Sequence, residues 1–357
     1  MLLETGTPML LSGDAYARGR AQAACGPPLA EAVREAVALR LAQAAPLLTR
    51  GDVREFLDRQ EANLEGLDPD AAAETRGIAD GFEIGYSELL TYLHLGLLRD
   101  FAQDGCSAWA WGMPGQADPV LVKNRDYRGE HVALQRVFLH RDPARNEDAV
   151  LCVGSLGSPG AFSSGMNAKG LAIVDTHVST RDHGPGLLRY FLMTRLLWAC
   201  ADVEDALGVI ASLPHAGGGC IVLADTAGRT AAVELGHNAQ AVDRRVPFVV
   251  KTNHFVDPAC APFWFPVGSD PMATSTRGRY ARLMTWLGAR MEPPQLADIA
   301  ALMGGHGEHG EEALCRHGQD GDSSTISCSV FAPSKRRLYF SAQNPCAGAW
   351  SVYDCRP

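Results

Sequence analysis

The sequence lacks the features that mark several common classes of protein. It has no CxxC pair, no basic segment leading into an apolar run near its N-terminus, and no long uninterrupted hydrophobic stretch. Its most apolar region, residues 187–213, contains several charged side chains, which argues against a membrane span. The formal net charge of −9 provides no overall basic field for nucleic acid or an anionic membrane. We therefore expect a cytoplasmic protein with neither nucleic-acid nor membrane partners.

The composition predicts a globular protein without a disulfide framework. With 357 residues, 46% hydrophobic and 20% charged, the chain is long enough to bury a sizeable core. Its ten cysteines are scattered through apolar surroundings, as at Cys152 and Cys200. Cysteines in such settings usually behave as small buried hydrophobic residues.

The pattern along the chain changes near residue 105. Residues 13–102 predict mostly helix, with a break at residues 26–28 and a capping box formed by Asp52 and Glu55. Beyond Cys106 we expect short strands over 108–112, 120–124, 132–140, 150–153, 171–174, 220–224, 230–235, 248–252, 325–331 and 338–342. A turn over 165–170, one long helix over 187–213 and helices over 276–289 and 295–303 are also expected. Because the strands come in hairpins without strict βαβ alternation, the pattern favours antiparallel sheets covered by helices.

Two segments invite a ligand-binding interpretation that their spacing does not support. Residues 304–317 contain His306, His309, Cys315 and His317, but the spacing is irregular and matches neither HExxH nor a cysteine knuckle. We predict no metal there. The glycines at 217–219 lead into a strand rather than a helix, so they predict a turn and not a phosphate loop. No cofactor is expected, and nothing in the sequence indicates a coenzyme A site.

A series of short motifs occurs in a specific order. They are Gly105-Cys106-Ser107, Lys123-Asn124-Arg125-Asp126-Tyr127, Gly165-Met166-Asn167, Thr252-Asn253-His254, Leu314-Cys315-Arg316-His317 and Gln343-Asn344-Pro345. Together they resemble the isopenicillin-N (acyl-CoA:6-aminopenicillanic acid) acyltransferase family of N-terminal-nucleophile (Ntn) hydrolases, also called peptidase family C45. No single motif is specific, but the ordered set covers nearly the whole chain.

The resemblance implies a fold and a processing event. The expected fold is α+β, a four-layer αββα sandwich with a helical N-terminal prodomain. The resemblance also implies self-cleavage between Gly105 and Cys106, after which an α chain (1–105) and a β chain (106–357) stay associated. It leaves open whether the protein forms a homo-oligomer.

The same resemblance implies roles for individual residues. Cys106 takes the place of the nucleophile that attacks an amide or thioester carbonyl. Asp126 and Arg316 match residues beside the nucleophile, and Asn253 matches the donor to the oxyanion. The expected substrate is a small N-acyl or peptide-like amide, and the sequence does not distinguish hydrolysis from acyl transfer.

The substrate-binding residues are predicted with less support. The related choloylglycine hydrolases carry an arginine three residues before the aspartate, where this chain has Lys123, and an asparagine near the position of Thr176 and His177. We include Tyr127 and His254 as further candidates, because each lies beside a reactive motif.

The residue types suit an N-terminal nucleophile. A thiol with a pKa of about 8.5 is mostly protonated at neutral pH, whereas an α-amine with a pKa of about 7.7–8.0 is partly neutral and can accept the thiol proton. Two alternatives remain open from the sequence. One is an uncleaved, non-catalytic binding protein on the same fold; the other is a thiol amidase in which Cys106 pairs with His177 or His254 without cleavage.

Overall fold

Two β-sheets form the centre of the protein. The computed structural model describes residues 2–98, 105–115, 118–145, 148–265, 270–307, 312–318 and 323–356. The first sheet has the order β1 (Leu2–Thr5), β15 (Ala349–Asp354), β14 (Arg337–Ser341), β13 (Ser324–Ala332), β4 (Val120–Tyr127), β3 (Gly105–Trp111) and β12 (Phe248–Lys251). The second has the order β11 (Gln240–Asp243), β10 (Thr230–Leu235), β9 (Gly219–Ala224), β8 (Ala172–His177), β7 (Ser164–Asn167), β6 (Ala149–Ser155), β5 (Gln135–Arg141) and β2 (Met9–Ser12).

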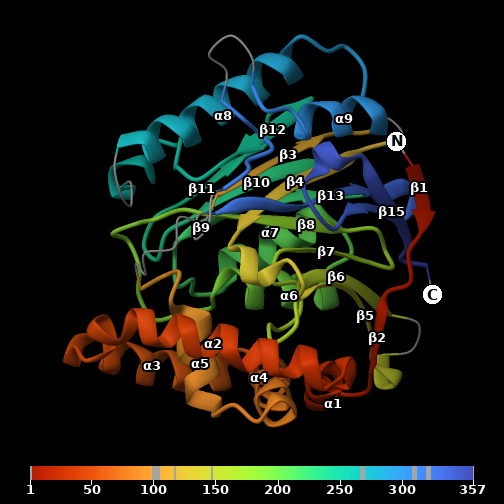
Figure 1. Ribbon diagram of the computed structural model, residues 1–357. Helices are drawn as coiled ribbons and strands as arrows, with labels where there is room; N and C mark the ends of the chain where they lie inside the picture. Colours follow the sequence, from red (N-terminus) through yellow and green to blue (C-terminus); the bar gives the residue numbers. More distant parts are fainter. Residues whose placement is uncertain are drawn as a thin grey trace.

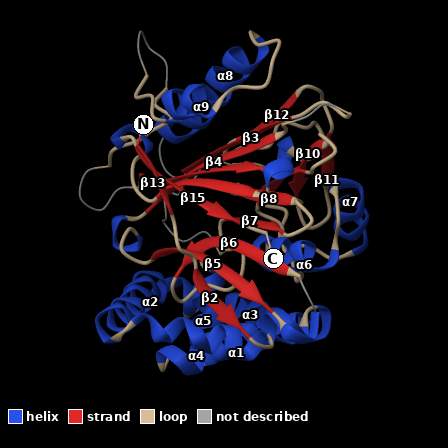
Figure 2. Cartoon of the chain, turned by 90° about the vertical axis from the view of Figure 1, so that its right-hand side faces the viewer, coloured by secondary structure: helices blue, strands red, loops and turns tan. Residues whose placement is uncertain are grey.

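Helices cover both outer faces of this pair of sheets (Figure 1). Over the first sheet lie α8 (Asp270–Gly288) and α9 (Leu296–Met303). On the side of the second sheet lie α6 (Arg189–Ala199) and α7 (Val203–Ser212), together with the N-terminal helices α1 (Ala15–Ala21), α2 (Pro27–Leu48), α3 (Gly51–Leu67), α4 (Pro69–Phe82) and α5 (Tyr86–His94). The turned view shows the same order of layers (Figure 2).

The alternation of side chains along the strands explains the layers. In β3, Ala108 and Ala110 face the second sheet, whereas Trp109 and Trp111 pack against the α8–α9 layer. Successive side chains of a strand point to opposite faces, so a strand covered on both sides is buried throughout. All seven residues of β3 are buried. The fold is therefore α+β, and the four-layer αββα sandwich is confirmed.

The N-terminal part differs from the expected helical prodomain in one respect. Its first residues form strands β1 and β2, which pair in parallel with β15 and β5 at the edges of the two sheets. Each of these pairings joins residues that precede Cys106 to strands that follow it.

Several local predictions were wrong for identifiable reasons. Helix α3 begins at Gly51 with no side-chain cap, so Asp52 lies within its first turn instead of forming a capping box. The helix expected over 187–213 is two helices, because Asp202 accepts hydrogen bonds from the backbone N–H groups of Glu204 and Asp205 and starts α7.

Other predictions shifted or missed elements. The expected turn over 165–170 is partly strand β7, so the turn itself is shorter. The helical region expected to extend to residue 102 has its last described helix, α5, ending at His94, and residues 99–102 lie outside the described part of the chain. Strands β11 and β15 were missed, whereas the hairpins β9–β10 and β13–β14 are confirmed.

Among the described residues, no helix has the length and apolar character needed to cross a membrane. The cytoplasmic location stays a prediction from the sequence.

Candidate active site

Cys106 lies at the start of β3, where this strand pairs antiparallel with β4. Its register partner is Arg125, and directly paired residues of antiparallel strands point to the same face. Cys106 alternates with Ala108 and Ala110, so that face is the one turned toward the second sheet. Both residues line a pocket that also reaches α5 and α6. The thiol is therefore at the pocket surface, where strand β3 begins.

Gly105 leaves no room for a side chain. A Cβ atom at this position would lie 2.7 Å from Asp126 Oδ2 and 2.8 Å from Arg316 Nη1. Both distances are shorter than ordinary van der Waals contact. The charged groups of Asp126 and Arg316 approach the backbone of the residue before Cys106 so closely that only glycine fits there without a shift.

Asp126 is buried beside the Gly105–Cys106 bond. Its Oδ1 accepts a hydrogen bond of 2.6 Å from Thr325 Oγ1, and Arg316 Nη1 lies 3.8 Å from its Oδ2. Oδ2 has no hydrogen-bond partner among the described residues. A buried carboxylate oxygen without a donor usually has a reason, and here it lies against Gly105, where a Cβ atom would be 2.7 Å from it.

Asn253 contacts the backbone of Cys106 directly. Its Oδ1 accepts hydrogen bonds from Cys106 N at 2.9 Å and from Arg279 Nη2 at 2.8 Å. Its Nδ2 donates to the carbonyl oxygen of His177 at 2.8 Å. These partners fix the orientation of the amide, because Oδ1 meets only donors and Nδ2 meets an acceptor. One Nδ2 hydrogen remains for a further acceptor.

Arg279 is a site residue that sequence reasoning missed. It lies on α8, is 1% exposed, and donates from Nη1 to the carbonyl oxygen of Cys106 at 2.6 Å and to Ser107 Oγ at 2.9 Å. Arg279 also donates to Asn253 Oδ1, so it links the carbonyl group of Cys106 to the side-chain amide that accepts from Cys106 N. Nothing in the sequence marks it, since a single arginine on a helix is usually a surface residue.

Lys123 belongs to a buried ion cluster at the same pocket. Its Nζ pairs with Asp175 Oδ1 and donates to the carbonyl oxygen of Ser163 at 3.1 Å. Arg189 Nε pairs with the other oxygen of Asp175 at 2.5 Å. Burial alone would raise the pKa of Asp175, but the two cations outweigh it and lower this pKa overall.

Of the other four predicted substrate-binding residues, two line the pocket and two do not. Tyr127 and His177 line the pocket together with Cys106. Thr176 and His254 do not belong to that lining. His254 Nδ1 instead faces the hydroxyl groups of Thr252 and Thr276, at 3.1 and 3.0 Å.

Burial has the largest effect on the pKa values of Cys106, His177 and His254. It raises the pKa of the Cys106 thiol in the intact chain, with a smaller opposing effect from Lys123. Burial also lowers the pKa of His177 to about 3 and that of His254 to about 4. The thiol therefore needs a base, and neither imidazole has a large affinity for a proton at neutral pH.

Comparison with known proteins identifies the family. The family model for acyl-coenzyme A:6-aminopenicillanic acid acyl-transferase matches residues 113–347. The chain belongs to this family. Among curated proteins, none matches the sequence significantly.

Three solved structures are reported for comparison. Two variants of conjugated bile acid hydrolase from Clostridium perfringens share 12% and 13% sequence identity with this chain, each with a TM-score of 0.44. They cover 69% and 70% of this chain, and 92% of each of their own chains is matched. Penicillin V acylase from Agrobacterium tumefaciens has 15% identity and a TM-score of 0.39, over 66% of this chain and 82% of its own.

Membership in the acyl-transferase family confirms the resemblance drawn from the ordered motifs. It makes the chain an enzyme of amide-bond chemistry, an amide hydrolase or an N-acyltransferase. The matched region contains Asp126, Asn253 and Arg316 and begins after Cys106. The choice of Cys106 therefore depends on its position in the fold and not on the match itself.

Proposed function

We propose that this chain is the precursor of an Ntn amidase or acyltransferase that cuts itself between Gly105 and Cys106. The observation that carries the proposal is the position of Cys106. Its backbone nitrogen lies 2.9 Å from Asn253 Oδ1, and its side chain lines the pocket. Cleavage would turn that nitrogen into a free amine while leaving it in contact with Asn253.

Self-cleavage can proceed from the groups present. The Cys106 thiol attacks the Gly105 carbonyl carbon, its proton passes to the Cys106 nitrogen, the Gly105–Cys106 C–N bond breaks, and a thioester with a free Cys106 amine results. Water then hydrolyses the thioester, which gives a Gly105 carboxylate and restores the thiol. Asp126 Oδ2, which has no donor in the described structure, would then lie beside the new amine. This carboxylate would hold and orient that amine.

The processed enzyme would use the same residues in turnover. The Cys106 amine accepts the thiol proton, and the thiolate attacks the substrate carbonyl. The developing oxyanion needs a positioned donor, and loss of one such donor typically slows catalysis about 100-fold or more. Asn253 Nδ2 has a hydrogen free for this purpose. The substrate C–N bond breaks, and the leaving amine takes the proton held by the Cys106 ammonium group. The acyl-Cys106 intermediate then reacts with water or with an amine, which restores the thiol.

The pocket favours a small acyl amide that also carries an anionic group. Arg125 is 4% exposed, and its Nη2 donates to Ser155 Oγ at 3.2 Å, whereas its buried Nη1 has no hydrogen-bond partner in the described part of the chain. A buried guanidinium nitrogen without an acceptor suits a carboxylate oxygen of a ligand. Tyr92, Leu93 and Phe162 supply apolar surface for an acyl group.

Extensive buried contacts would keep the two fragments together after cleavage. Gln22 donates to the carbonyl oxygen of Ser158 and accepts from Gly157 N, both at 3.0 Å. Gln60 makes a similar pair of bonds to the backbone of Gly186, at 3.1 and 2.7 Å. These buried bonds and the strand pairings of β1 and β2 support an α chain that remains bound.

A panel of amide substrates tests this function directly. Wild type and Cys106→Ala are compared on N-acyl amino acids, N-acyl amides without a carboxylate, and penicillin-type amides, with and without an added amine acceptor. We expect turnover only with Cys106 present and a preference for carboxylate-bearing substrates that Arg125→Gln reduces at least tenfold in kcat/KM. Cys25→Ala, at a thiol outside the pocket, serves as the matched control.

The two alternatives give different outcomes in the same experiment. A Cys–His amidase without cleavage requires that His177→Ala abolish turnover in a chain that stays intact. A non-catalytic binding protein requires that no substrate in the panel be turned over, although ligands still bind. Activity that persists in Cys106→Ala would contradict the proposal and both alternatives.

A further inference from the structure

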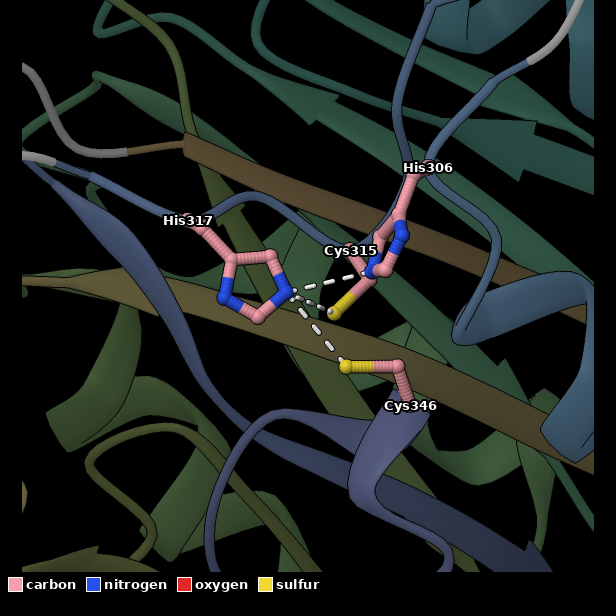
Figure 3. Close-up of side chains that lie close together, drawn as sticks. All are labelled: His306, Cys315, His317 and Cys346. Carbon is pink, nitrogen blue, oxygen red and sulfur yellow. Dashed lines mark hydrogen bonds between the residues drawn. The ribbon is translucent and has the colours of Figure 1, made fainter.

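Four metal-ligating side chains meet at a point separate from the pocket. They are His306, Cys315, His317 and Cys346, and one ligand atom from each lies within 4.8 Å of all the others. Figure 3 shows the four side chains converging from separate segments of the chain. His306 follows α9, Cys315 and His317 flank Arg316, and Cys346 lies in the short 3-10 helix of Pro345–Ala347.

We propose that these four residues bind one Zn²⁺ ion in a closed tetrahedral site. Two cysteine sulfurs and two histidine nitrogens form a common ligand set of structural zinc. This proposal reverses the expectation of no metal from the sequence. The irregular spacing of the segment concealed the site, because its fourth ligand, Cys346, comes from a later part of the chain.

The distances between the ligand atoms suit a tetrahedron around zinc. Zn–N bonds of about 2.0–2.1 Å and Zn–S bonds of about 2.3 Å at the tetrahedral angle separate two nitrogens by about 3.4 Å and a nitrogen from a sulfur by about 3.6 Å. Here His317 Nε2 lies 3.1 Å from His306 Nε2, 3.4 Å from Cys346 Sγ and 3.8 Å from Cys315 Sγ. Each value is within about half an ångström of the tetrahedral one.

The surroundings hold the ligands in place without the ion. Gly305 O accepts hydrogen bonds from the backbone N–H groups of Leu314 and Cys315, which ties the end of α9 to the second ligand. Asn344 Nδ2 donates to Arg316 O at 3.1 Å and to Thr325 O at 2.7 Å, and lies 3.7 Å from Cys315 Sγ. Cys315 is buried, whereas the other three ligands are exposed enough for an ion to enter.

The ion would position a residue of the active site. Arg316 stands between two of the ligands, and its backbone N and O bond to Thr325, whose hydroxyl group bonds to Asp126. By joining the end of α9, the Arg316 segment and the helix of Cys346, zinc would fix the guanidinium 3.8 Å from Asp126. Its role is structural, and it does not depend on self-cleavage or on the substrate.

Metal analysis of the full chain, purified without a histidine tag, tests the site. We expect about one zinc per chain in the wild type, and a loss of at least tenfold in zinc affinity in both Cys346→Ser and His306→Gln. Cys25→Ser and Cys106→Ala are the controls and should keep the metal, which separates this site from the catalytic thiol.

Cobalt provides a readout that is independent of enzymatic activity. Co²⁺ added to the metal-free wild type should give the visible bands of a tetrahedral ion and a thiolate charge-transfer band in the near ultraviolet. Cys346→Ser should weaken the charge-transfer band, and His306→Gln should change the visible bands while keeping both thiolates. Circular dichroism identifies any variant that is unfolded.

Three results would overturn the proposal. One is a wild-type chain that binds neither zinc nor cobalt after reduction. Another is unchanged metal affinity in both ligand variants. The third is a chain that is lighter by two hydrogens and carries a Cys315–Cys346 disulfide in the active enzyme.

Discussion

At the scale of single residues, Gly105 is a tightly confined position next to the proposed cleavage site. A methyl group on this residue would lie within 3 Å of both Asp126 Oδ2 and Arg316 Nη1. Arg316 can move, since it is partly exposed, but Asp126 is buried and held by Thr325. Gly105→Ala should therefore displace the carboxylate and slow self-cleavage at least tenfold.

The rate of appearance of the two fragments, followed by mass spectrometry, measures this effect. Gly129→Ala is the matched control, because a Cβ there meets nothing within 4 Å. Normal processing of Gly105→Ala would show that the close approach of Asp126 has no role in cleavage.

Arg279 leads to a second prediction at this scale. It holds both the carbonyl oxygen of Cys106 and the Oδ1 of Asn253. Arg279→Leu should reduce kcat about 100-fold, as expected when a donor to the oxyanion loses its position, with a smaller change in KM. Steady-state kinetics on processed enzyme measure both constants, and Arg277→Gln, an exposed position on the same helix, is the control. A change confined to KM would instead place Arg279 in substrate binding.

At the scale of elements, the sequence predicted hairpins better than helix ends. The β9–β10 and β13–β14 hairpins were clear because apolar runs flank strong turn residues. Helix boundaries depend on which polar residue caps the backbone, and Asp202 is one of several charged residues in a region of helical pattern, so the sequence did not single it out as a cap. Strand β15 pairs with its neighbour β14 and also with β1 from the other end of the chain, and no local pattern contains the second pairing.

The cap at Asp202 can be tested by its effect on stability. Its Oδ1 accepts hydrogen bonds of 2.9 and 3.0 Å from Glu204 N and Asp205 N at the start of α7. Asp202→Ala should lower the free energy of unfolding by about 1 kcal/mol, the usual value of an N-cap. Urea denaturation in the uncleaved Cys106→Ala background measures it, and Glu35→Ala, an exposed helical position, should change little. No loss in Asp202→Ala would mean that packing alone separates α6 from α7.

The residues of the candidate site also fall into two groups: those that a local motif predicts, and those whose role depends on contacts with distant segments. Cys106, Asp126, Asn253 and Arg316 lie in motifs and come together in the structure. Arg279 and Cys346 could not be predicted, because each acquires its role only through contacts with distant segments. Thr176 and His254 lie next to motif residues in sequence, yet they do not line the pocket.

At the scale of the whole molecule, buried imidazoles make stability depend on pH. Burial lowers the pKa of His131 and His140 to about 3 and that of His94 to about 4. The unfolded chain binds these protons near pH 6.5 and the folded chain does not, so their contribution is complete above pH 6.5 and is lost as the pH falls toward these values. The free energy of unfolding should therefore decrease steadily from pH 6.5 to pH 4.

His131→Leu should reduce that slope. Neither ring nitrogen of His131 has a hydrogen-bond partner within the described ranges of the chain, so the apolar replacement removes a titrating group without breaking a bond seen there. The slope of the free energy of unfolding against pH changes by about 1.4 kcal/mol per pH unit for each proton by which the unfolded and folded states differ. Denaturant titrations of Cys106→Ala, with and without His131→Leu, at several pH values give the two slopes. Identical slopes would place the acid sensitivity elsewhere.

At the scale of the whole molecule, the paired sheets and their helical layers bring Gly105 and Cys106 together with Asp126, Asn253 and the pocket, and we propose that the bond between them is cut. Intact-mass measurement of purified, active protein tests this claim most directly. The account predicts two species, one ending at Gly105 and the other beginning at Cys106, that elute together under native conditions, and a single uncut chain for Cys106→Ala. A single 38.2 kDa species with full amidase activity would contradict it.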